Sequence, residues 1–235
     1  AIARTGRAPA AEVGTLGTEI PASSLPAEGG GLPTLGISDD TLAPVGFEPS
    51  GVMVLAGPPA SGRTNALRWL IASVERAHPK VMRYYFGSPR SVVAQLPGWE
   101  ATALTVEDAA SLAKEVAATV AEAPAGDKIL VVIEQIGDFL STSADSAMVE
   151  MIKAVKRSDH LLIAENESGG WGSSWPLLQE VKAARTGFLL QPESMEGDTI
   201  LKTSLPRVSR ADFPPGRGFF VARGKAMRVQ LPLAE

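Results

Sequence analysis

Short apolar runs alternate along this chain with longer segments of helical spacing. The apolar runs are rich in branched and aromatic residues and predict strands at residues 52–56, 80–87, 101–104, 128–135, 160–166 and 185–191. The segments between them predict helices at residues 65–74, 91–96, 109–122, 145–156 and 177–184. This alternation predicts an α/β fold with a mainly parallel central sheet flanked by helices.

The end of the chain follows a different pattern. Two apolar segments, 214–221 and 227–231, are joined by Arg223-Gly224-Lys225. A tight, glycine-containing connection between two such segments is typical of an antiparallel pair. We therefore expect a C-terminal β-hairpin.

The stretch from Gly51 to Leu70 carries the clearest chemical signal. A buried strand is followed by the segment GPPASGRT, which fits the phosphate-loop pattern G-x-x-x-x-G-K-[ST] except that Arg63 replaces the lysine, and a helix follows. In such a loop the backbone N–H groups and the helix N-terminus attract phosphate, and the Thr64 hydroxyl would bind Mg²⁺. The candidate ATP-contacting residues are Gly57, Pro58, Pro59, Ala60, Ser61, Gly62, Arg63, Thr64 and Asn65. The alternative is a strand-to-helix turn without a ligand.

The most apolar strand ends in a carboxylate about 70 residues after this loop. An apolar run ending in an acidic residue is typical of a Walker B strand, in which Glu134 would hold Mg²⁺ and Gln135 would stand where a catalytic Glu polarises the attacking water. Gln135 cannot accept a proton, and Glu134 is longer than the usual Asp, so both catalytic positions are degenerate. An ordinary central strand with a polar end is the alternative.

Two further residues are candidates for contacts with the nucleotide. Asn166 ends the strand expected at residues 160–166 and could sense the γ-phosphate, or it could simply begin a turn. Arg185 could reach a neighbouring subunit's phosphate as an arginine finger, or it could be a solvated residue at a helix end.

Composition narrows the classes of function. The chain has 235 residues, 45% hydrophobic residues, a net charge of −4 and no cysteine. Disulfides, cysteine zinc sites and thiol catalysis are excluded, and the whole chain shows no basic footprint for nucleic acid. No apolar run is long enough for a membrane span.

Residues 1–46 differ from the rest and are rich in Ala, Gly, Pro, Ser and Thr. We expect them to form a leader packed along a single ATPase domain at residues 47–235. The start lacks both a convincing secretory signal and an initiator Met, which suggests a processed product or a piece of a longer protein.

Several segments together resemble the FtsK/SpoIIIE superfamily, in particular the C-terminal ATPase modules of EccC/EssC-type type VII secretion motors. The resemblance covers about residues 15 to 235 and is carried by the segments GPPASGRT, VVIEQIGDF, HLLIAEN, ARTGFLLQPESMEGDTIL and PPGRGFFVARGKAMRVQLP. It implies a RecA-like P-loop NTPase module in a longer protein, cytoplasmic but tethered to the inner membrane. Its implied partners are neighbouring ATPase modules, a helical secreted peptide and the other subunits of a hexameric ring.

The resemblance and the residues leave three functions open. The first is a degenerate module that binds ATP and Mg²⁺, hydrolyses ATP weakly or not at all, and helps recognise a secreted substrate's C-terminal signal. The second is an active DNA translocase, which the acidic balance opposes. The third is a scaffold with a vestigial nucleotide site. Whether the chain is an enzyme is therefore left open by the sequence.

Overall fold

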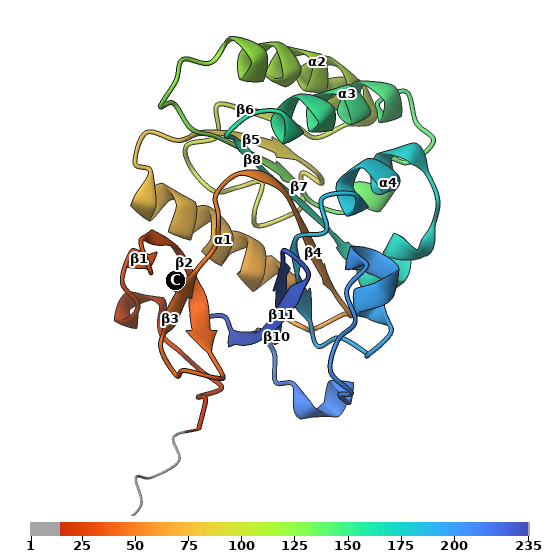
Figure 1. Cartoon of the computed structure of the whole chain (residues 1–235). Coiled ribbons are helices and arrows are strands. Elements are labelled where there is room, and N and C mark those ends of the chain that lie inside the picture. The colour runs from red at the N-terminus through yellow and green to blue at the C-terminus, as the bar shows by residue number, and fades with distance from the viewer. Residues whose placement is uncertain (1–14, 235) are drawn as a thin grey trace, which may run out of the picture.

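The computed structural model describes residues 15–234, and their centre is an 11-stranded mixed sheet (Figure 1). Its parallel part runs, in spatial order, through β9 (Gly187–Leu190), β4 (Gly51–Gly57), β8 (Leu161–Glu167), β7 (Ile129–Ile133), β5 (Met82–Phe86) and β6 (Ala101–Ala103). Because β8 lies between β4 and β7, it separates the strand before the phosphate loop from the strand predicted to be Walker B. The predicted mainly parallel α/β architecture is confirmed.

Helices cover both faces of this parallel part (Figure 1). One face is covered by α2 (Val106–Glu122), α3 (Asp145–Lys156) and α4 (Pro176–Lys182). The opposite face is covered by α1 (Arg63–Ala77) and by residues before β4. Burial on both faces explains why the central strands read as continuous apolar runs.

Successive side chains of β8 therefore enter two different cores. Leu161 and Ile163 pack in the core under α1, whereas Leu162 and Ala164 pack in the core under α2, α3 and α4. Since strand side chains alternate between the faces of a sheet, Glu165 points toward the α1 face and Asn166 toward the other. This alternation decides which polar residue reaches the phosphate loop.

Local sequence signals fix the start of α2. Thr105 is its N-cap, and the Thr105 hydroxyl accepts a hydrogen bond from the Asp108 N–H at 3.1 Å. Such a cap satisfies one of the unpaired N–H groups at the start of a helix.

The helix expected at residues 91–96 is wrong, because turns occupy this segment. There the Ser91 hydroxyl accepts the Val93 N–H at 3.0 Å, and Pro97 follows directly.

Antiparallel strands extend the sheet beyond β9. The C-terminal hairpin consists of β10 (Arg217–Ala222) and β11 (Lys225–Gln230), as predicted. Three strands from the predicted leader join it, namely β1 (Glu28–Gly29), β2 (Leu32–Ser38) and β3 (Pro44–Gly46), with β2 paired to β11. Residues 1–14 of the predicted leader lie outside the described residues, and the division at residue 46 stays a prediction.

In residues 15–234, every helix is too short or too polar to cross a membrane.

Candidate nucleotide site

The phosphate loop joins the carboxyl end of β4 to the first turn of α1, which is the order that the motif requires. Gly62 adopts a φ of 97°, a left-handed conformation that favours glycine. A Cβ on Gly57 would lie 2.5 Å from the Ser61 Oγ and 2.8 Å from the Leu190 Cβ, so this position has no room for a side chain. The Ser61 hydroxyl donates to the Pro58 carbonyl at 2.8 Å and closes the loop on itself.

The C-terminal segment supports this loop from behind. The Gly216 N–H donates to the Ser61 carbonyl at 2.9 Å, and a Cβ on Gly62 would lie 3.2 Å from the Gly216 nitrogen. Pro214-Pro215-Gly216 therefore packs directly against the loop, although about 150 residues separate the two segments.

Glu134 lies at the end of β7 and faces the loop across β8. The Tyr85 hydroxyl donates to the Glu134 Oε2 at 2.5 Å, in a buried position. Burial raises the pKa of Tyr85, and the hydrogen bond with Glu134 raises it further, so the phenol stays protonated as the donor. One oxygen of the carboxylate predicted to act as the Walker B acid is thus already bound.

Glu165 is the site residue that the sequence analysis missed. Its carboxylate pairs with the Arg63 guanidinium, and its Oε2 accepts the Gln135 N–H at 2.9 Å. The side chain of Glu165 is 3% exposed and that of Arg63 is 17% exposed. Burial raises the pKa of Glu165, while the Gln135 N–H and Arg63 act in the opposite direction. Glu165 therefore links the phosphate loop to the turn after the Walker B strand.

These groups surround a pocket of about 240 Å³. Its lining consists of Ala60, Gly62, Arg63, Thr64, Glu134, Gln135 and Glu165. The volume lies below the usual range for a whole drug-sized ligand, so the pocket fits phosphates with the base and sugar outside. It contains one cationic and two acidic side chains.

The backbone of the loop fits a phosphate of ATP as it stands. The side chains would fit Mg²⁺ only together with a bound phosphate. The glycine positions and the helix N-terminus form the phosphate cradle, and Thr64 and Glu134 line the same pocket, where they would hold Mg²⁺. Among residues 15–234, no three His, Asp or Glu side chains gather as a metal site. A bound Mg²⁺ would therefore depend on phosphate oxygens for part of its coordination.

The loop residues Gly57, Pro58, Pro59 and Ser61 do not line the pocket, and the candidates outside the loop that lie away from its lining are Asn65, Asn166 and Arg185. The Asn65 amide donates to the Pro232 carbonyl at 2.9 Å and accepts the Ala234 N–H at 2.8 Å, so it holds the C-terminal segment. The Asn166 side chain lies against Gly137 and Gly170, on the sheet face opposite Glu165. Arg185 is exposed and precedes β9, at the amino ends of the parallel strands. Since the loop is at their carboxyl ends, Arg185 could serve only a neighbouring molecule.

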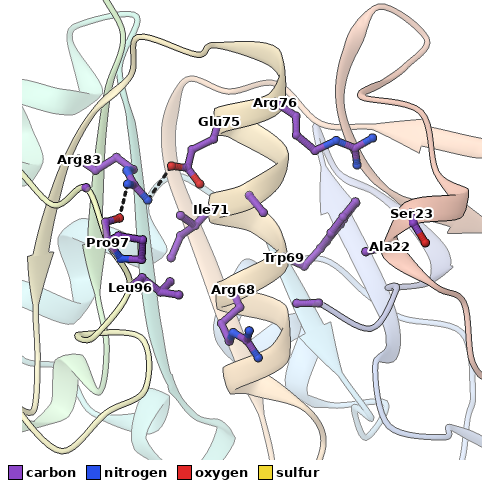
Figure 2. Close-up of a pocket in the computed structure, with 13 residues that line it drawn as sticks. Ala22, Ser23, Arg68, Trp69, Ile71, Glu75, Arg76, Arg83, Leu96 and Pro97 are labelled. Carbon is purple, nitrogen blue, oxygen red and sulfur yellow. Dashed lines mark hydrogen bonds and ion pairs between the residues drawn. The ribbon is translucent and has the colours of Figure 1, made fainter.

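A second and larger cavity, of about 750 Å³, lies along the outer side of α1 (Figure 2). We call it the α1 groove, and it is lined by Ala22, Ser23, Arg68, Trp69, Ile71, Ala72, Glu75, Arg76, Arg83, Leu96, Pro97, Gly98 and Ala234. Its floor is apolar, and its charged side chains comprise three arginines and one glutamate. Arg83 pairs with Glu75 at 2.8 Å and donates to the Pro97 carbonyl at 2.5 Å, which fixes one wall.

Comparisons with known proteins agree with this geometry. No family model and no curated protein sequence matches the chain. Among solved structures, the cytoplasmic domain of the Thermomonospora curvata type VII secretion ATPase EccC is similar, with 25% identity and a TM-score of 0.73 over 94% of this chain and 28% of the other. Thermomonospora curvata EccC ATPases 2 and 3, in complex with a signal sequence peptide, give 25% identity and a TM-score of 0.75, covering 94% and 44%.

A more distant structure shows the same fold. ATPases 2 and 3 of EssC from Geobacillus thermodenitrificans match with 17% identity and a TM-score of 0.73, over 94% of this chain and 46% of the other. The chain thus spans between a quarter and a half of the length of these three neighbours.

Proposed function

Starting from the membership of this chain in the FtsK/SpoIIIE superfamily, as an ATPase module of the EccC/EssC type, we propose that it is a nucleotide-holding module of a type VII secretion motor. In this proposal it binds ATP with Mg²⁺, hydrolyses ATP weakly or not at all, and helps recognise the C-terminal signal of a secreted substrate. The observation that carries it is a preserved phosphate cradle whose charged side chains already have partners, Arg63 with Glu165 and Glu134 with the Tyr85 hydroxyl.

We expect weak hydrolysis because each acidic or amide side chain near the cradle either cannot accept a proton or already has a hydrogen-bond partner. Gln135 cannot take a proton from water, and its N–H is bound to Glu165. Glu134 accepts the Tyr85 hydroxyl, and Glu165 is paired with Arg63. No carboxylate among the pocket-lining residues is left with all of its oxygens available to a catalytic water. The backbone amides of the loop, in contrast, need no such partner to hold a phosphate.

Calorimetric titration with ATP and Mg²⁺ tests the nucleotide site. We expect binding at micromolar concentration or tighter, and Arg63→Ala should weaken it roughly 10-fold, since a charged hydrogen bond contributes about 1.5–3 kcal/mol. Arg90→Ala is the matched control, because Arg90 is exposed and lies outside the pocket lining. An unchanged affinity in Arg63→Ala would contradict the assignment of this loop.

The same titration separates the competing functions. A scaffold with a vestigial site would show no binding below about millimolar ATP, a range in which the binding free energy is only about 4 kcal/mol. A DNA translocase would instead hydrolyse ATP at about 1 per second or faster when DNA is added. The net charge of −4 argues against that activity, because DNA binding depends on basic side chains.

The other parts of the proposal concern the whole motor. We propose that the module is joined to neighbouring ATPase modules in a longer chain, that this chain is cytoplasmic and tethered to the inner membrane, and that it assembles into hexameric rings. In a ring, Arg185 would be available to a neighbouring module, since it is exposed at the edge of the sheet opposite the phosphate loop.

We assign substrate recognition to the α1 groove. It combines an apolar floor with three arginines against one glutamate, which favours a helical peptide that carries an acidic residue beside its apolar face. EccC ATPases 2 and 3 are known in complex with a signal sequence peptide, and that finding supports this class of partner.

Charge reversal in the α1 groove tests peptide recognition. Arg68→Glu should weaken the binding of a C-terminal signal peptide from a type VII substrate by roughly 10-fold, because it replaces attraction by repulsion near the groove. Fluorescence anisotropy with a labelled peptide measures the affinity, and Arg90→Glu outside the groove is the control. Equal losses in both variants would indicate a nonspecific charge effect and would contradict the groove assignment.

A further inference from the structure

The pairing of Arg63 with Glu165 joins two residues that the phosphate-loop pattern does not connect. Arg63 begins α1 and Glu165 lies near the end of β8, so the contact spans 102 residues of sequence. Arg63 occupies the position whose cation contacts the nucleotide phosphates in a phosphate loop. In this structure the guanidinium is bound to a carboxylate of the same chain instead.

A carboxylate and a phosphate compete for the same groups of a guanidinium. Arg presents a planar fork of N–H donors that matches both anions in the same way. The Arg63 side chain is 17% exposed and Glu165 is 3% exposed, so solvent screens this pair only weakly. Glu165 occupies one terminal nitrogen of the Arg63 guanidinium, so a phosphate that takes the same nitrogen must displace Glu165.

Glu165 also contacts the turn after the Walker B strand. The Gln135 N–H donates to it at 2.9 Å, and Gln135 adopts a φ of 52°, a left-handed conformation that costs roughly 1 kcal/mol for a residue other than glycine. The turn continues into the short helical segment Ile136–Phe139. Loss of the Glu165 contact would remove one of the bonds that hold this turn in place.

We propose that Glu165 is an internal competitor for Arg63, which lowers the affinity of the cradle for phosphates and links its occupancy to the Gln135 turn. The inference rests on the proposed nucleotide site and concerns its regulation. When a polyphosphate binds, Arg63 exchanges Glu165 for a phosphate oxygen. Glu165 is then a carboxylate beside a bound anion, turns away and releases the Gln135 N–H. Glu165 is thus a positioning residue, because it acts through Arg63.

Glu165→Gln tests the competition directly, since it keeps the size of the side chain and removes its charge. We expect ATP, titrated with EDTA in excess to exclude Mg²⁺, to bind at least roughly 10-fold more tightly than to the wild type, which corresponds to about 1.4 kcal/mol. A merely structural role would produce the opposite result, because damage to the site weakens binding.

Glu134→Gln is the matched control, because Glu134 lines the same pocket and carries the same charge but contacts Tyr85 instead of Arg63. An equal gain in affinity in this variant would mean that only the net charge of the pocket matters, and it would overturn the proposal. A double-mutant cycle adds a second test. In an Arg63→Ala background, Glu165→Gln should change the affinity by less than about 3-fold; a full 10-fold gain there would overturn the proposal.

Hydrogen exchange can be measured on the wild-type chain, so this test does not depend on the folding of a variant. Hydrogen exchange at the Gln135 amide should become faster when ATP is added, because the bond to Glu165 is released. Unchanged exchange at saturating ATP would overturn the proposal.

The outcomes also separate this inference from the proposed function. If the wild type and Glu165→Gln bind ATP equally, the competition is overturned and the nucleotide site stands. If only Glu165→Gln binds, the competition is supported, and ATP binding by the native chain is contradicted when the wild type also fails to bind ATP with Mg²⁺. If neither binds with or without Mg²⁺, both proposals fall.

Discussion

Replacing Trp69 with alanine is expected to lower the free energy of unfolding by about 3–5 kcal/mol. Trp69 is 1% exposed, lies in the core under α1, and donates its indole N–H to the Leu35 carbonyl at 2.7 Å. The substitution would leave a cavity between α1 and β2 and an unpaired carbonyl. Urea denaturation at constant pH, followed by circular dichroism, measures the change.

One variant separates the contributions of packing and hydrogen bonding to this loss, and a second variant is the control. Trp69→Phe keeps most of the buried volume and removes the hydrogen bond, so it should cost less than Trp69→Ala. Trp175→Ala is the control, since Trp175 is 47% exposed, and it should lower the stability by less than about 1 kcal/mol. If Trp69→Ala were as stable as Trp175→Ala, the position of Trp69 in the core would be contradicted.

Gly57→Ala is expected to reduce ATP affinity by roughly 100-fold or more, because the new Cβ would lie 2.5 Å from the Ser61 Oγ and 2.8 Å from the Leu190 Cβ. The loop would have to shift, and its N–H groups would no longer converge on one phosphate. Loss of two charge-assisted hydrogen bonds, at about 1.5–3 kcal/mol each, accounts for this magnitude. Calorimetric titration with ATP and Mg²⁺ provides the affinity.

Gly169→Ala is the matched control for this effect. A Cβ at Gly169 would meet nothing within 4 Å, and its φ is not in the left-handed range. We expect this variant to bind ATP as the wild type does. Wild-type affinity in Gly57→Ala, with the variant folded, would show that phosphate binds elsewhere.

The succession of elements could be predicted from the sequence because the signals that determine it are local. A strand, a glycine-rich loop and a helix follow one another between Gly51 and Leu70, and the helix Asp145–Lys156 has the same bounds in the structure as in the prediction. Each signal depends on side-chain periodicity or on a residue within a turn. The segment 91–96 shows the limit, since Ser91 and Pro97 produce turns despite several helix-forming residues.

The candidate site could be predicted only in part because its decisive contact is not local. The sequence places both Glu165 and Asn166 at the end of β8, but only the pairing of strands and the position of α1 determine which face each one occupies. The alternation of Leu161, Ile163 and Glu165 on one face was a usable signal. The ion pair with Arg63 requires β8 to lie beside β4, and no local pattern reveals the strand order of a parallel sheet.

Two segments near opposite ends of the described chain, one before β1 and one after β11, meet each other. The Leu233 N–H donates to the Ile20 carbonyl at 2.8 Å, and Pro21 forms a bridge with Leu233. If tension were applied through polypeptide attached before Ile20 and after Leu233, it would shear this short bridge, because the two paired segments are parallel and would be pulled from opposite ends. Asn65 in the first turn of α1 also holds Pro232 and Ala234, so part of the load would pass to the start of the helix that follows the phosphate loop.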